Sequence, residues 1–186
     1  MATMDASQVG VGAAAVTGAV FVAPNTATLP TDATTTLANT FVHLGFTSDA
    51  GVRISESSNT ESIRAWEGRT EVYVVHTEYT ESVSFMPIQI NADVAKLTWG
   101  DDAVEVDSTT GALHVKHHGG TLPPKKIVIE TTPREGIVRR YAGTFQLVER
   151  GEQTMDGTQV DGRNLTFDAV ADSNGVTMHE YTAFTD

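Results

Sequence analysis

The sequence predicts a mostly β fold, an antiparallel β-sandwich or barrel-like sheet with one flanking short α-helix and a long β-hairpin. Three observations support this prediction. Apolar and polar residues alternate in many short segments, most junctions carry Gly, Pro, Asp-Gly or Asn-Gly, and helix signals gather in one place, at residues 91–100. Strands joined by short turns pair antiparallel and close into sandwiches or barrels.

Composition limits the classes of function. The 186 residues, 40% of them hydrophobic, suit one domain with a real core. The chain has no cysteine, which excludes disulfides, thiolate metal sites and cysteine nucleophiles. Its 24 acids against 12 bases give a formal charge of -12, which repels nucleic-acid phosphates and anionic lipid. No stretch suits a transmembrane helix, so we expect no membrane partner.

The chain begins with a predicted arm. Residues 1–18 are rich in Ala, Gly and Ser without a period, which predicts a flexible N-terminal arm that orders on docking. The remainder, 19–186, is expected to form a single β-sandwich domain. Strands are predicted at about 18–23 and 41–46, separated by a threonine-rich connection.

A polar segment and an alternating segment follow. Residues 48–68 are dominated by polar side chains and are predicted to form a long loop with weak strand character around residues 52–55. Loops of such length are usually functional, and the alternative is a disordered surface excursion. Residues 69–90 alternate apolar and polar side chains on either side of a polar break. They are predicted to form a long hairpin of two strands, with a wide tip at residues 77–81 that contains no Gly or Pro.

A short helix is predicted at 91–99. Asn91 is a suitable N-cap, Asp93 places an acid in the first turn, and Gly100 is a C-terminal stop. The helix is too short to be stable alone, so it must pack on a sheet. Its packing stripe is expected to comprise Val94, Leu97 and Trp99.

The second half predicts six or more strands. Two short strands surround a turn at 107–111, and four longer apolar segments follow between turn formers. These segments are KKIVIETT, IVRRYAGTFQLVER, NLTFDAVAD and VTMHEYTAF. No repeat of fixed period occurs, which excludes propellers and solenoids.

Residues that could carry chemistry are few. His114 and His118 share a strand face but lie two pleats apart, roughly 13 Å, too far for one metal without other ligands. Asp101, Asp102 and Glu105 lack the alternating oxygens and central Gly of a calcium loop. Hydrolase, metalloprotease, P-loop and dinucleotide motifs do not occur. We therefore expect no catalytic residue, no metal site and no cofactor.

Several segments, taken in order, resemble the major tail tube proteins of long-tailed, siphovirus-type bacteriophages, especially those of actinobacterial hosts. The segments are TGAVFVAP, LPTDATTTLANTFVHLGFTSDAGV, ESIRAWEG, INADVAKLTWGDDAV and DAVADSNGVTMHEY. Their order and spacing carry the resemblance, which covers most of the chain. The run VERGEQTMDGTQVDGRNL departs from the family pattern through extra turns.

The resemblance implies a structural virion protein rather than an enzyme. Six copies would form a ring in which neighbouring sheets make one continuous β-barrel, and stacked rings would form the tail tube. The expected partners are other copies of the chain, the tape measure protein and the tail proteins at the tube ends. Genomic DNA would pass through the lumen without stable binding. The protein would be assembled in the host cytoplasm and reside in the phage tail.

The residues give independent reasons for assembly. A long hairpin exceeds what a small domain can bury, and unpaired strand edges invite pairing with another copy. Candidates for the lumen wall are the hairpin acids Glu71, Glu78 and Glu81. Candidates for contacts between rings are Trp66, Arg64 and Arg69. The alternative is a β-sandwich carbohydrate-binding or adhesin module, in which exposed aromatic residues would form a row on one sheet face.

Overall fold

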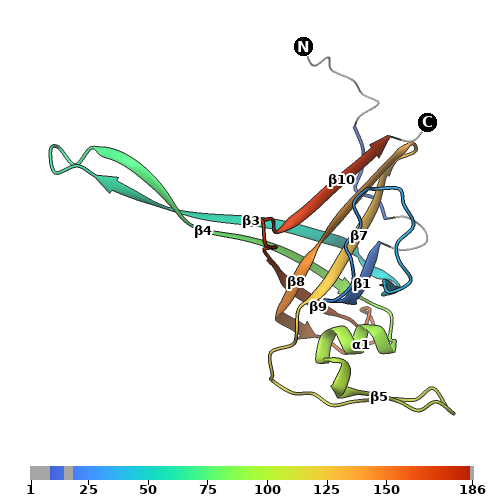
Figure 1. Ribbon diagram of the computed structural model, residues 1–186. Coiled ribbons are helices and arrows are strands. Elements are labelled where there is room, and N and C mark those ends of the chain that lie inside the picture. The colour runs from blue at the N-terminus through green and yellow to red at the C-terminus, as the bar shows by residue number, and fades with distance from the viewer. Residues whose placement is uncertain (1–8, 15–18, 185–186) are drawn as a thin grey trace.

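The computed structural model describes residues 9–14 and 19–184 (Figure 1). In these residues, one eight-stranded antiparallel sheet has the order β2-β1-β7-β8-β9-β4-β3, with β10 paired to β8, and β5 and β6 form a separate ribbon. The elements are β1 (Val20–Pro24), β2 (Val42–His43), β3 (Thr47–Arg64), β4 (Glu71–Pro87), α1 (Ala92–Trp99), the 3-10 helix η2 (Asp101–Ala103), β5 (Val104–Val106), β6 (Leu113–Val115), β7 (Lys125–Arg134), β8 (Ile137–Gln153), β9 (Arg163–Val170) and β10 (Met178–Phe184). The predicted fold class is confirmed.

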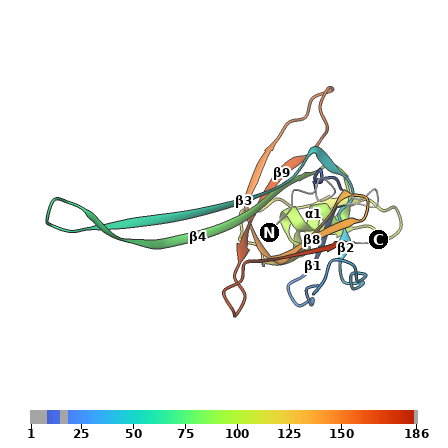
Figure 2. The ribbon, with the colours of Figure 1, turned by 90° about the horizontal axis from the view of Figure 1, so that it is seen from above.

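The main core joins distant strands of the sheet. Val20 of β1, Phe85 of β4 and Leu97 of α1 belong to one buried cluster, although β1 and β4 are far apart in the strand order. The sheet therefore curls around this cluster, and α1 covers it (Figure 2). Phe85 stacks on Phe167 of β9, with ring centroids 5.4 Å apart.

The connection between β1 and β2 covers the opposite face of the sheet. Its apolar residues pack on a second cluster that contains Phe41, Val128 and Ala142. Arg140 is buried beneath it and donates from Nε to Glu130 (2.8 Å) and from Nη1 to the carbonyl of Asp32 (2.7 Å). Because a buried guanidinium is tolerated only when it is paired, these bonds fix the connection to the sheet.

The predicted caps of α1 are present. Asn91 Oδ1 accepts from the backbone N–H of Val94 at 2.8 Å, and Asn91 Nδ2 donates to the carbonyl of Leu44 at 3.0 Å. Gly100 ends the helix at φ 101°, in the region that favours glycine. Val94 and Leu97 pack against the main core.

Trp99 departs from the predicted packing stripe. It is only half-buried and lies outside both core clusters. Its ring stacks on His117 at 3.8 Å between centroids, and the guanidinium carbons of Arg150 and Arg163 lie 4.9 and 5.5 Å from the ring centroid. A large ring at the last helical residue is thus held by cations at the edge of the fold, not by the core.

The predicted loop at 48–68 is wrong, and so is the predicted tip at 77–81. Residues 47–64 form the single strand β3, and β4 runs unbroken from Glu71 to Pro87. The hairpin therefore comprises β3 and β4, with its turn at residues 65–70, and not 69–90 alone. Strand β3 has no alternating apolar face because most of its residues are exposed on both faces, so its sequence lacks the signal of a half-buried strand.

Part of the predicted N-terminal arm lies outside the described residues, namely 1–8 and 15–18. The described part runs beside the end of β7. The backbone N–H of Val11 donates to the carbonyl of Pro133 at 2.8 Å, and that of Thr132 donates to the carbonyl of Ala13 at 2.9 Å. Residues 9–14 therefore extend the pairing of the sheet.

Candidate assembly surfaces

The hairpin projects far from the body of the protein. Only residues 82–85 of β4 pair with β9; from Thr80 toward the tip, in the described chain, β4 pairs with β3 alone. We call residues 57–80 the distal hairpin. Both ribbon views show it extending well beyond the other strands (Figures 1 and 2). No third strand or helix covers the distal hairpin in the part of the chain that the structure describes.

The candidate lumen acids do not share one face. Glu81 alternates with Val83 and Phe85 and therefore points to the core side, whereas Glu78 lies three residues away and points to the opposite side. Glu71 lies opposite Arg64, beyond two register shifts of the β3–β4 pairing. A single strand face cannot present both Glu78 and Glu81.

Glu81 is also buried. The residue is 6% exposed, and its carboxylate accepts a hydrogen bond from the hydroxyl of Thr177, the residue before β10. It lies directly opposite Glu56 on the same face, and Tyr79 follows toward the tip. Desolvation, with added repulsion from Glu81 and Glu56, raises the pKa of Tyr79. Glu81 therefore belongs to the junction between hairpin and body and not to an open channel wall.

The opposite face of the hairpin is polar. Its cross-strand pairs combine hydroxyl and amide side chains with one base and one acid: Arg53–Ser84, Ser55–Ser82, Ser57–Thr80 and Asn59–Glu78. Asn59 Nδ2 donates to Glu78 at 2.9 Å. We call these eight residues the hydroxyl-rich face. Its formal charges cancel, because Arg53 and Glu78 are its only ionised side chains.

The candidates for contacts between rings lie at or beside the turn. Trp66 is 95% exposed, Arg64 ends β3, and Arg69 has a φ of 54°, in the left-handed region. Further large apolar side chains are exposed along the distal hairpin: Ile63, Val72, Tyr73, Val74 and Tyr79. These side chains lie on both faces of the ribbon, because neighbours such as Tyr73 and Val74 alternate along β4, and exposed apolar surface of this kind is typical of binding sites for other molecules. The run VYVV carried this signal in the sequence.

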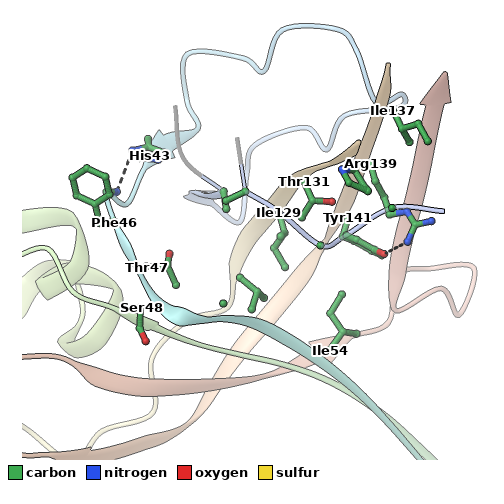
Figure 3. A pocket seen from close by; sticks show the side chains of 18 of the residues that line it. His43, Phe46, Thr47, Ser48, Ile54, Ile129, Thr131, Ile137, Arg139 and Tyr141 are labelled. Carbon is green, nitrogen blue, oxygen red and sulfur yellow. Dashed lines mark hydrogen bonds between the residues drawn. The ribbon is translucent and has the colours of Figure 1, made fainter. Parts of the chain in front are cut away.

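A groove of about 850 Å³ lies between β7, β8 and β10 on one side and the start of β3 on the other (Figure 3). Ile54, Ile129 and Tyr141 supply apolar walls, and Phe46 at the rim is 73% exposed. Among the described lining residues, Arg139 is the one Lys or Arg, and none is Asp or Glu. Sequence reasoning missed this groove because its walls come from segments that are distant along the chain.

Three of the residues considered for chemistry, Glu105, His114 and Asp101, are engaged in ion pairs. Glu105 binds His114 and Lys116, and Asp101 binds Lys125. No group of three or more His, Asp or Glu residues able to hold a metal occurs within 9–14 and 19–184. Nor does any helix in those ranges have the length and apolarity needed to cross a membrane.

The described chain is thus a curled antiparallel sheet with a projecting ribbon whose apolar residues are uncovered. Comparison with known proteins gives the family. A family model described as phage tail tube protein matches residues 2–182, so the chain belongs to the phage tail tube protein family. It is therefore a structural component of a phage tail and not an enzyme.

Several solved structures are similar to the chain, and one of them has low sequence identity. It is described as "Tail of empty GTA particle computed with helical refinement, C6 symmetry". The identity is 11% and the TM-score 0.44, with 99% of this chain and 100% of that chain covered. A likeness at this TM-score has no bearing on how the present chain assembles. No curated protein matches the chain.

Proposed function

We propose that the chain self-assembles into six-membered rings that stack into the tail tube, a conduit for the tape measure protein and genomic DNA. The distal hairpin carries this proposal. A two-stranded ribbon is marginally stable in water, and this one exposes apolar side chains without a covering layer in the described chain. Another copy that covers the distal hairpin would stabilise the ribbon and bury its exposed apolar side chains. The number six comes from the family resemblance.

Open strand edges support ring closure. Within the described residues, β2, β3 and β10 each pair with one strand only, so their outer edges are free. Free edges are sites for pairing with another chain, and a closed ring removes them. Trp66, Arg64 and Arg69, at the far end of the hairpin, would then contact a neighbouring ring.

The hydroxyl-rich face is the best candidate for the lumen wall. It is uncharged overall and lies on the side of β3 and β4 opposite the main core. Such a wall offers a polyanion neither a basic patch to hold it nor an apolar surface. Of the three candidate acids, we retain Glu78 as a residue of the lumen wall. Glu71 lies beside the hairpin turn, and Glu81 is excluded because it is buried.

A conduit of this kind also implies the remaining partners of the chain. The tape measure protein would fill the lumen before ejection, and other tail proteins would cap the tube ends. With a formal charge of -12, the chain would let DNA pass without stable binding. Assembly would take place in the host cytoplasm.

Negative-stain electron microscopy of the purified protein at high concentration tests the proposal. Rings or tubes are the expected result. A persistent monomer that is retained on a glycan column would instead favour the carbohydrate-binding alternative. The ring size is read from top views by rotational symmetry, and any order other than six would correct the proposed stoichiometry.

The lumen assignment has its own test, in phage that carry variant tubes. Glu78→Gln raises the formal charge of the hydroxyl-rich face by one per copy, and DNA ejection is expected to become slower at low salt and to recover as salt screens the wall. Glu56→Gln, on the opposite face of the hairpin, is the matched control. Equal ejection kinetics for both variants across the salt range would remove the hydroxyl-rich face from the lumen.

A further inference from the structure

We propose that the groove beside β3 is the receptor for Trp66 of a second copy, with Glu67 of that copy paired to Arg139. The inference rests on the proposed self-assembly and adds the site at which the hairpin tip docks. The groove is lined by the residues in Figure 3, and the tip comprises residues 65–70.

A hairpin tip cannot reach the groove of its own chain. Ile54 of β3 lines the groove, and the turn begins eleven residues further along a continuous strand. At strand rise this separates the two by about 35 Å. Both ribbon views show the hairpin directed away from β7, β8 and β10 (Figures 1 and 2). A hairpin tip that docks in the groove must therefore come from another copy.

The groove and the tip match in polarity. Ile54, Ile129 and Tyr141 form a wall that can cover an indole, and the groove has room for residues beside it. Trp66 is 95% exposed in the single chain, as expected of an anchor whose pocket lies elsewhere. Tryptophan is enriched among the residues that dominate interface energies, because one ring buries a large apolar area.

The groove also exposes apolar rings of its own. Phe46 is 73% exposed and Phe184 69%, and both line the groove. Phe46 lies in the link before β3 and Phe184 ends β10, so the exposed surface spans two edges of the sheet. Docking of the tip would cover these two rings together with Trp66.

A charge pair would add to the apolar match. The chain has 24 acids, yet none of the described lining residues is Asp or Glu. Arg139 donates from Nη1 to the Tyr141 hydroxyl at 3.3 Å, and its Nε lies 3.1 Å from Glu180. A guanidinium has five N–H donors, so Arg139 can keep both contacts and bind a further carboxylate. Glu67 follows Trp66 directly and supplies it.

Crosslinking within assembled tubes tests the docking site. The chain has no cysteine, so engineered thiols are the only reactive ones. One population carries Ala65→Cys at the tip and a second carries Ser48→Cys in the groove; the two are mixed, assembled and treated with a short bismaleimide. The expected product is a crosslinked pair containing one copy of each variant, present in tubes and absent from dilute monomer.

The control pair keeps Ser48→Cys and replaces the tip thiol by Met155→Cys, an exposed residue in the loop between β8 and β9. It is expected to give no product. Tubes in which Ala65→Cys fails to link to Ser48→Cys, or links no better than Met155→Cys, would overturn the docking site and leave the tube proposal standing. A wild-type chain that forms neither rings nor tubes would overturn both.

Variants at the tip give a second readout. Trp66→Ala is expected to raise the protein concentration needed for tube formation about thirtyfold, the factor that corresponds to a loss of ~2 kcal/mol at an interface anchor. Trp66→Phe should raise it less. Glu67→Lys and Arg139→Glu should each weaken assembly, and the double variant should assemble better than either single variant. An Arg139→Glu monomer with unchanged melting excludes misfolding, and a double variant no better than the single ones contradicts the pair.

Discussion

The two halves of one hairpin differ in what surrounds them. Near the body, Val83 and Phe85 of β4 are buried in the main core, and residues 82–85 also pair with β9. In the distal hairpin the same two strands continue their pairing, but apolar side chains such as Tyr73 are exposed. Backbone pairing between β3 and β4 thus continues well beyond the residues whose side chains are buried in the core. The proximal half is therefore part of the fold, whereas the distal half gains its stability from a partner only under the proposed assembly.

The largest effect is expected in the proximal half. Phe85→Ala removes a buried ring that stacks on Phe167, and should destabilise the monomer by about 3–5 kcal/mol, as large cavities in cores do. Chemical denaturation at a concentration where the protein is monomeric measures this loss. A loss below about 1 kcal/mol, far under the usual cost of such a truncation, would mean that β4 does not belong to the core.

A smaller effect is expected where α1 is tied to the sheet. Asn91→Ala removes the cap of Val94 N–H and the bond to the Leu44 carbonyl, and should cost about 0.5–2 kcal/mol, with the same folded structure. Asn91→Asp retains the capping oxygen and loses only the bond to Leu44. It should lie between wild type and Asn91→Ala in denaturation experiments; equal losses for both variants would assign the whole effect to the Leu44 bond.

Asp32, in the connection between β1 and β2, is expected to make the free energy of unfolding depend on pH. Hydrogen bonds from the Thr35 hydroxyl and from the Thr35 and Thr34 N–H groups lower the pKa of Asp32 from 3.8 to about 2. A pKa lowered by folding means that this contribution is present above about pH 4 and is lost as pH falls through the folded value. The stability of Asp32→Asn should therefore fall less steeply than that of the wild type as pH falls from about 4 to about 2. An identical pH dependence of the melting temperature in wild type and variant across this range would contradict the assignment.

The smallest effect on the monomer is expected at the hairpin tip. Trp66→Ala changes an exposed side chain and should alter the monomer's free energy of unfolding by less than about 0.5 kcal/mol. Tube assembly should nevertheless be lost or weakened. A monomer destabilised by Trp66→Ala as much as by Asn91→Ala would show that the tip packs on its own chain.

The sequence predicted the parts of the fold that have local signals. Strands β5 to β10 follow apolar alternation bounded by turn formers, and α1 follows from Asn91 and Gly100. Most of β3 is predicted as loop, with weak strand character only around residues 52–55, because most of its residues are polar on both faces. What makes it a strand is pairing with β4 over its whole length, which single-segment patterns do not contain.

The candidate sites show the same limit. Trp66 is one of two tryptophans and precedes Glu-Gly in the segment predicted as a long loop, and the structure shows it exposed at the hairpin turn. Glu71, Glu78 and Glu81 are grouped as acids of the predicted hairpin, yet strand geometry places Glu78 and Glu81 on opposite faces. The groove could not be predicted, because Phe46, Ile129 and Phe184 meet only through the curl of the sheet.

Backbone hydrogen exchange tests most directly whether the distal hairpin is stable only when another copy covers it. Exchange at residues 57–80 should be compared with residues 82–85 in monomer and in assembled tubes. We expect fast exchange at 57–80 in the monomer beside slow exchange at 82–85, because local openings are cheap where few apolar contacts are buried. In tubes both segments should be protected. Strong protection of 57–80 in the monomer, or fast exchange there in tubes, would contradict the claim.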